Sequence, residues 1–306
     1  MKAEDKFKYE WLVAALAWVA QLWALKSLPS DSYWVVMLLL LSACLLMPLS
    51  RRLLDCESQQ TWWPRVELGC ALLIAVSFIA NTVVYIIPWL LIRSAAALEA
   101  LGNCRKKTLD NSAELALLSA RVFPAIGAAW LVANRANWTP WGFDPLIVLL
   151  TAAHFHHAGF TLPLMAGLNA KAKPGCWTRF SCVAILLGVP LVAVGITCTH
   201  FGVLKFVEPF GVTILVMGAL GVALSQMRRG LEKKHPNWTR FGFLISGASL
   251  FIAMLLALSF GLRYLIPNYA LTMPQMWMIH GTLNAIGFGL CGILAWRGAS
   301  KQAEHP

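Results

Sequence analysis

The sequence predicts an all-α protein, a polytopic transmembrane helix bundle with eight or nine spans. Hydrophobic residues make up 58% of the 306 residues and charged ones only 13%, whereas a soluble domain carries about 25% charged residues. Apolar stretches of roughly 18 residues or more, the length that crosses a bilayer as a helix, recur along the whole chain. The loops between them are short, so we expect a single transmembrane domain over residues 1–306.

Nine apolar segments can be marked, and each can cross a hydrocarbon core about 30 Å thick at about 1.5 Å per residue. The third contains Asn81 and Pro88, where a helix can break. The segments are 11–28, 33–49, 67–92, 113–133, 143–169, 178–200, 208–226, 239–264 and 273–296.

Basic residues predict the orientation of these segments. The net charge of +11 comes largely from short loops beside apolar spans, which is typical of cytoplasmic loops and of contact with anionic lipid headgroups. The loops after the third, fifth and seventh segments are the basic ones, which predicts a cytoplasmic C-terminus in a bacterial inner membrane. Nine spans would then put the N-terminus outside, although it carries Lys2, Lys6 and Lys8. This conflict indicates a re-entrant or broken helix among the first three segments.

Several function classes are disfavoured by composition and motifs. The basic residues form no basic-aromatic nucleic-acid module, so nucleic acid is not expected as a partner. The eight cysteines contain no CxxC pair and lie mostly in apolar segments, which argues against a disulfide framework. HExxH, GxSxG, P-loop and dinucleotide-binding motifs are absent from the sequence, and no cofactor is expected.

Two polar clusters lie inside apolar segments. The fifth segment contains His154, His156 and His157, and the ninth contains His280 with Asn284 one turn away. A charged group at the centre of a membrane helix costs roughly 2.5 kcal/mol or more, and a neutral imidazole still needs hydrogen-bond partners or a metal. Because the two clusters are expected at similar depth, the sequence predicts one shared buried polar site.

The fifth segment must distort if all its histidines are to reach one site. On an ideal helix His154 and His157 share a face, while His156 points about 200° away from His154. Gly159 and Pro163 follow closely and make a local break plausible. The alternative interpretation is that an individual histidine packs against a neighbouring helix and is bonded to a carbonyl group.

Other polar groups are candidates for the same cavity. Arg121, in the fourth segment, needs a partner, and Glu114 is expected on the same helix face. Asp144 and Glu208 each precede a proline at the outer end of a segment, where an acid favours the helix dipole. In an apolar cavity, either carboxyl could instead serve as a proton donor.

The candidate residues form two sets. The predicted catalytic residues are His154, His156, His280, Asn284, Asp144 and Glu208. The predicted substrate-binding residues are Asn81, Tyr85, Arg121, Trp141, Phe155, Phe160, Trp277 and Phe288.

Two blocks of sequence resemble the YndJ-like family of bacterial membrane proteins. They are Gly142-Phe143…Ile147-Val148-Leu149-Leu150-Thr151-Ala152-Ala153-His154-Phe155-His156…Ala158-Gly159-Phe160 and His280-Gly281…Leu283-Asn284-Ala285…Gly287-Phe288. The resemblance extends from the fourth segment to the C-terminus and implies roles for His154, His156, His280 and Asn284. His157 departs from the pattern, which has an aromatic residue there. The chain is also similar in size and polarity pattern to membrane-bound bacterial terpene cyclases.

Three functions fit these observations. The first is an intramembrane enzyme whose buried histidine or acid drives a redox-neutral cyclisation or isomerisation of a lipophilic substrate such as an isoprenoid, with aromatic faces stabilising cationic intermediates. The second is a proton-coupled transporter, which is how the resembling family is often described. The third is a metal- or haem-binding membrane protein with histidine ligands. The absence of an inverted repeat disfavours the transporter.

Overall fold

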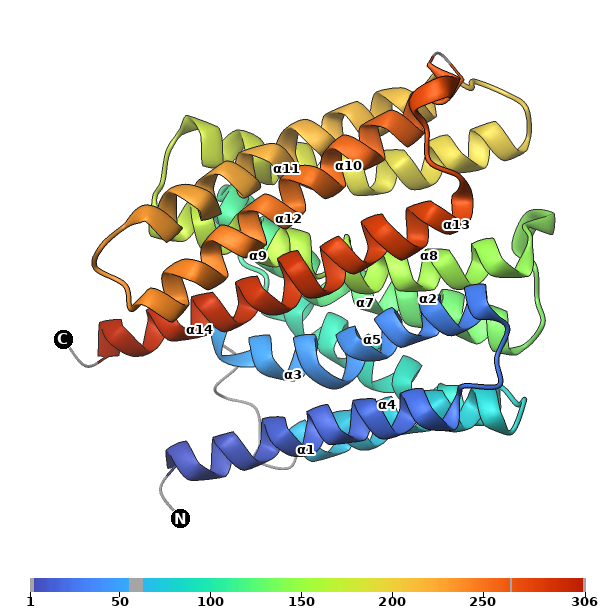
Figure 1. Ribbon diagram of the computed structural model, residues 1–306, viewed down its shortest axis with the longest axis horizontal. Helices are drawn as coiled ribbons and strands as arrows, with labels where there is room; N and C mark the ends of the chain where they lie inside the picture. The colour runs from blue at the N-terminus through green and yellow to red at the C-terminus, as the bar shows by residue number, and fades with distance from the viewer. Residues whose placement is uncertain (1–2, 55–62, 265, 305–306) are drawn as a thin grey trace. The chain divides into compact units, whose positions relative to one another are not determined.

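The computed structural model describes residues 3–54, 63–264 and 266–304, which contain helices, turns and loops but no strand (Figure 1). Within these ranges, eight helices are long and apolar enough to cross a membrane. The predicted all-α transmembrane fold is therefore confirmed. The eight helices are Ser30–Leu54, Val84–Gly102, Ser112–Arg135, Pro145–Ala172, Cys176–His200, Val207–Leu231, Asn237–Gly261 and Met273–Ser300.

The chain divides into two compact units. Unit 1 comprises Met1–Glu99 and Val122–His156, and unit 2 comprises Ala100–Arg121 and His157–Pro306. The single domain over residues 1–306 stays a prediction.

Unit 1 begins with α1 (Ala3–Ala24), followed by α2 (Ser30–Leu41). The second helix continues through a π-helical stretch (Ser42–Leu46), α3 (Met47–Ser50) and a 3-10 turn (Arg51–Leu54). The core of this unit is apolar: six of the twelve residues of α2 are buried, all of them Val or Leu. The remaining helices are α4 (Trp63–Ile79), most of α5 (Ile87–Gly102), the second half of α7 (Ser112–Arg135) and α8 (Pro145–His157).

The third apolar segment, 67–92, is two helices and not one. Helix α4 ends at Ile79, and Asn81 adopts a left-handed conformation with φ of 48°, which an asparagine tolerates better than most residues. A 3-10 turn (Val84–Ile86) leads into α5, in which Pro88 occupies the first turn. The alternative of a break at Asn81 is thus confirmed, and α4 and α5 become a helical hairpin.

Unit 2 is built around three long helices, α10 (Cys176–His200), α11 (Val207–Leu231) and α12 (Asn237–Gly261). Glycines bring these helices into close contact. A Cβ atom on Gly188 would lie 2.7 Å from Cα of Leu215, and one on Gly211 would lie 2.9 Å from the carbonyl carbon of Leu191. Small residues at such crossings are the usual means of packing helices in a bilayer, where lipid removes the hydrophobic driving force.

Two further spans, Pro145–Ala172 and Met273–Ser300, are irregular helices. Helix α8 ends at His157, and α9 (Thr161–Ala172) begins after a turn that contains Gly159. The last span starts with α13 (Met273–Gln275) and contains π-helical stretches at Met276–His280 and Leu283–Leu290 before α14 (Cys291–Glu304). π-Helical turns are often found at functional sites.

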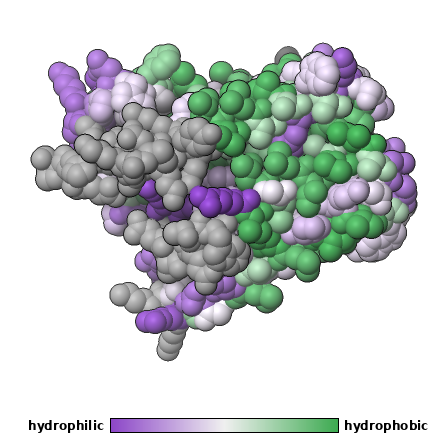
Figure 2. Space-filling model, turned by 90° about the horizontal axis from the view of Figure 1, so that it is seen from below, coloured by the Kyte–Doolittle hydropathy of each residue, from purple (hydrophilic) through white to green (hydrophobic). Residues whose placement is uncertain are grey.

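The surface is that of a membrane protein. In Figure 2 apolar side chains cover much of the coloured part of the visible face, with hydrophilic ones scattered among them and gathered at the right-hand edge. Large side chains such as Leu16, Leu91, Leu187 and Phe210 are 54–63% exposed, although they lie in apolar helices. Such a surface is stable only in contact with lipid or another apolar phase.

Candidate functional site

The central feature of unit 2 is a pair of polar side chains on the π-helical part of the last span. Nδ1 of His280 lies 2.9 Å from the carbonyl oxygen of Ala253, on α12. Nδ2 of Asn284 lies 3.1 Å from Nε2 of His280 and donates at 2.8 Å to the carbonyl oxygen of the same residue. The predicted one-turn spacing therefore places the amide directly beside the imidazole.

These partners define the tautomer of His280. A carbonyl oxygen only accepts, so Nδ1 must carry the hydrogen that it donates to Ala253. In a neutral ring Nε2 then holds the lone pair, which accepts from the amide of Asn284. A neutral imidazole with its Nδ1–H anchored on a backbone carbonyl presents Nε2 as a base in a defined direction. Both residues are half-buried.

Unit 1 contains a second histidine with the same arrangement. Nδ1 of His156 lies 2.7 Å from the carbonyl oxygen of Ala152, and Nε2 accepts from the indole Nε1–H of Trp89 at 3.0 Å. The His156 ring also stacks on that indole with an angle of 19° between the ring planes. Gly127 makes room for it, since a Cβ there would lie 2.6 Å from Nδ1. His156 is 0% exposed, and these contacts hold its ring in place.

A buried ion cluster lies beside Trp89. The Arg93 guanidinium packs over the Trp89 ring at 4.7 Å and forms an ion pair with Glu67 at 2.5 Å. Arg51 adds a second contact to the same carboxylate at 3.4 Å. The side chains of Glu67 and Arg93 are only 3% and 9% exposed. Sequence reasoning missed this cluster, although an acid within an apolar segment signals a buried partner.

The two acids singled out from the sequence have different surroundings. Asp144 is exposed, and its Oδ1 accepts the backbone N–H of Leu146 at 2.8 Å, which is the expected first-turn role. Glu208 is 3% exposed and pairs with Arg263 at 2.6 Å. Burial by itself would lower the pKa of the Arg263 guanidinium, but the hydrogen bonds and charges of Glu208 and Tyr264 raise it overall.

The predicted substrate-binding residues lie in varied positions. Oδ1 of Asn81 accepts a hydrogen bond from Nη2 of Arg135. Glu114, which was the expected partner of Arg121, forms an ion pair with Lys171 at 3.1 Å. Tyr85 and Trp141 are 39% and 63% exposed. The four other aromatic side chains are each at most 9% exposed: Phe155, Phe160, Trp277 and Phe288.

Because His154 and His156 belong to unit 1 and His280 and Asn284 to unit 2, their meeting in one chamber stays a prediction. Within the described parts of the chain, His, Cys, Asp and Glu side chains form no group of three that could hold a metal ion. His280 with Asn284 is therefore the polar pair whose geometry is best defined.

Comparison with known proteins assigns the chain to a family. The model of the YndJ-like protein family matches residues 37–288. The chain belongs to the YndJ-like family. Both the His154–His156 stretch and the His280–Asn284 pair fall within the matched range, which also includes Glu67 and Arg93.

A curated relative agrees with this family. It is the uncharacterized membrane protein YndJ of Bacillus subtilis (strain 168), which is 28% identical over 203 residues. The alignment covers 66% of this chain and 36% of that relative, so the chain corresponds to about a third of the relative's length. No solved structure matches the chain significantly. Together with the apolar helices, these findings make the chain an integral membrane protein.

Proposed function

We propose that the chain acts as an intramembrane enzyme in which His280 exchanges a proton with a lipophilic substrate. The observation that carries this proposal is the pair of contacts made by the His280 ring, with Nδ1 2.9 Å from the Ala253 carbonyl oxygen and Nε2 3.1 Å from Nδ2 of Asn284. This arrangement fits a neutral imidazole with its hydrogen on Nδ1. A base of this kind supports redox-neutral chemistry such as isomerisation or cyclisation, for which an isoprenoid is the substrate class we favour.

His280 suits this role better than His156 does. Both imidazoles have the same tautomer, but His156 is fully buried under the Trp89 indole, whereas His280 is half-buried. When Nε2 of His280 takes a proton, the Ala253 carbonyl oxygen stabilises the imidazolium through the Nδ1–H. Asn284 can then turn its amide oxygen towards the new N–H, because a side-chain amide both donates and accepts.

The test is the lipid content of cells that express the full chain. Mass spectrometry should detect a lipophilic product in cells with the unaltered chain and lose it in cells with His280→Gln, which keeps a polar side chain but accepts no proton. General acid-base groups contribute about 10²–10⁴-fold to rate, so residual product should fall at least a hundredfold. His200→Ala, at the exposed end of α10, is the matched control and should leave the product unchanged. Unchanged product with His280→Gln would exclude His280 as the base.

A proton-coupled transporter is the second candidate. The division between the units falls at two irregular places in the chain: within α7, close to Pro124, and at the end of α8, where the span breaks before α9. Broken helices are common in transporters. Proton uptake by proteoliposomes that depends on an added solute, measured with a trapped pH-sensitive dye, would favour transport over the enzyme.

The break at Asn81 also supports one orientation of the chain in the membrane. If α1 and α4 cross the membrane along with the eight longer helices, ten spans place both termini on one side. Helix α4 has 17 residues, the lower limit for a span. The basic loops then all lie on the side of the C-terminus, together with Lys2, Lys6 and Lys8. We therefore infer that both termini are cytoplasmic in the bacterial inner membrane.

A further inference from the structure

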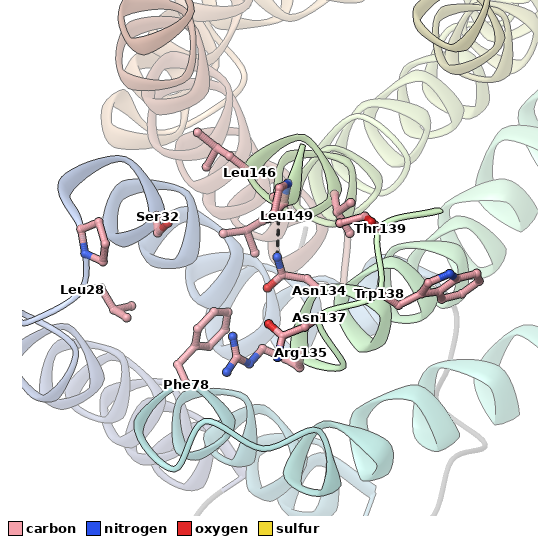
Figure 3. A pocket seen from close by; sticks show the side chains of 13 residues that line it. Leu28, Ser32, Phe78, Asn134, Arg135, Asn137, Trp138, Thr139, Leu146 and Leu149 are labelled. Carbon is pink, nitrogen blue, oxygen red and sulfur yellow. Dashed lines mark hydrogen bonds between the residues drawn. The ribbon is translucent and has the colours of Figure 1, made fainter. Parts of the chain in front are cut away.

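A pocket of about 230 Å³ lies in unit 1, and none of the histidines described above lines it (Figure 3). It lies where the loop after α1, the end of α4 and the connection from α7 to α8 come together. Its lining combines an apolar side, with Leu28, Leu146 and Leu149, and a polar side, with Asn137 and Arg135. In the figure the Arg135 guanidinium lies beside the Phe78 ring, below Asn134 and Asn137.

Arg135 is half-buried and carries a charge that no carboxylate balances among the residues that the structure describes. Its Nη2 donates to two neutral oxygens, the carbonyl of Ser77 at 3.2 Å and Oδ1 of Asn81 at 2.7 Å. Its Cζ lies 4.4 Å from the centre of the Phe78 ring. The Nε–H is buried and has no partner. The side chain is thus held firmly, but its charge and one of its donors remain unsatisfied.

The backbone explains only part of this arrangement. Arg135 is the last residue of α7, and Asn137 closes the helix end with φ of 53°. A cation at a helix C-terminus gains a small stabilisation from the helix dipole. That interaction involves the charge as a whole and leaves the buried Nε–H unpaired, whereas buried donors in folded proteins nearly always have a partner. An anion in the pocket would supply the missing negative charge.

The position of the pocket identifies the kind of anion. Trp138 lines it and is 64% exposed, and Trp141, close by in sequence, is 63% exposed. Exposed tryptophans beside a helix end are typical of the membrane–water boundary, where lipid phosphates lie. Arginine binds phosphate well because its planar group offers several donors at once. The leucine side of the pocket fits the first carbons of a hydrocarbon chain.

We propose that this pocket binds the phosphate group of an anionic amphiphile, with Arg135 as its cation and the leucine side in contact with the chain. The shared chemistry is the phosphate group, and its source is either a lipid or a free phosphate ion. The site lies in unit 1 and does not depend on any role of His280, so either proposal can fail without the other.

The test measures thermal unfolding and native mass spectra of the purified full chain in an uncharged detergent. Three additions are compared: phosphatidylglycerol, diacylglycerol with the same chains but no phosphate, and inorganic phosphate. Phosphatidylglycerol should bind and raise the unfolding temperature, and diacylglycerol should not. Inorganic phosphate that binds as tightly as the lipid identifies a soluble ligand, and weaker phosphate binding identifies the lipid.

Two variants tie the binding to Arg135. Arg135→Gln should weaken phosphatidylglycerol binding at least tenfold. Lys26→Gln is the matched control, because it removes one exposed charge from the same loop region without altering the pocket lining, and it should bind as the unaltered chain does. Asn137→Asp, at an exposed position whose conformation an aspartate tolerates, supplies an internal anion and should also weaken binding.

Asn137→Asp keeps the test decisive even if Arg135→Gln does not fold. Equal binding of phosphatidylglycerol by the unaltered chain and by the folded pocket variants would overturn the proposal. So would the absence of binding of both phosphatidylglycerol and inorganic phosphate by the unaltered chain.

Discussion

Replacing Glu67 by glutamine tests the buried ion cluster of unit 1 most sharply. The change keeps the shape of the side chain but removes the negative charge that faces Arg93 at 2.5 Å and Arg51 at 3.4 Å. Arg93 is 7% exposed, so its guanidinium would remain buried without a counter-ion. Breaking one side of a buried ion pair costs about 3–5 kcal/mol, and we expect a loss of that size in the free energy of unfolding.

The chain offers its own control for this experiment. Glu114 pairs with Lys171 at 3.1 Å, which is a similar contact, but the two side chains are 39% and 36% exposed. Solvent screens such a pair, which contributes about 0–1 kcal/mol. Glu114→Gln should therefore have little effect. Comparing the two substitutions separates burial from the mere presence of an ion pair.

The assay is denaturant unfolding of the purified chain in detergent, followed by tryptophan fluorescence. A double variant, Glu67→Gln with Arg93→Gln, should recover part of the loss, because the lone charge is gone. If Glu67→Gln lowered the free energy of unfolding by less than about 1 kcal/mol, as Glu114→Gln should, the cluster would not stabilise the unit in the way described.

The remaining predictions concern other contacts. Trp89→Phe leaves Nε2 of His156 buried without a donor and should lower the free energy of unfolding by about 1–3 kcal/mol. Trp138→Phe changes an exposed side chain and should have almost no effect, so equal losses from the two substitutions would contradict this. Gly195→Ala places a methyl group against the backbone of α11 and should lower the unfolding temperature of the purified chain, by a cost of about 1–3 kcal/mol; an unchanged temperature would show that the contact is looser than described. A cysteine at Thr82, in the turn between α4 and α5, should react with an impermeant reagent from outside intact cells; protection there, with labelling from the inside, would refute the ten-span orientation.

Most of the fold could be read from the sequence because membrane helices follow simple rules of length and apolarity. The segment 67–92 shows where those rules fail. The hydropathy of this segment is apolar throughout, so a prediction from hydropathy joins two helices into one. The two helices are separated by the turn at Asn81, which has a left-handed backbone conformation. The positive charges near the N-terminus were the sequence signal that the first three segments did not fit a nine-span arrangement.

The candidate site was predictable only in part. His280 and Asn284 are four residues apart on one helix, so local geometry sufficed to place them side by side. Glu67 and Arg93 lie on different helices, and their pairing depends on the turn at Asn81, which hydropathy does not reveal. Arg135 follows the apolar segment 113–133, and nothing in the sequence distinguishes it from other basic residues beside a span. Its lack of a carboxylate partner is a property of the folded unit, and so is the pocket beside it.

The most direct test of the central claim is nitrogen NMR of the full chain with labelled histidine side chains, in which the His280 signal is assigned through its loss in His280→Gln. The proposed base requires a neutral imidazole near neutral pH with its hydrogen on Nδ1 and a lone pair on Nε2. We expect that tautomer. A hydrogen found on Nε2, or an imidazole that is doubly protonated at neutral pH, would contradict the account, because Nε2 would then hold no lone pair to accept a proton.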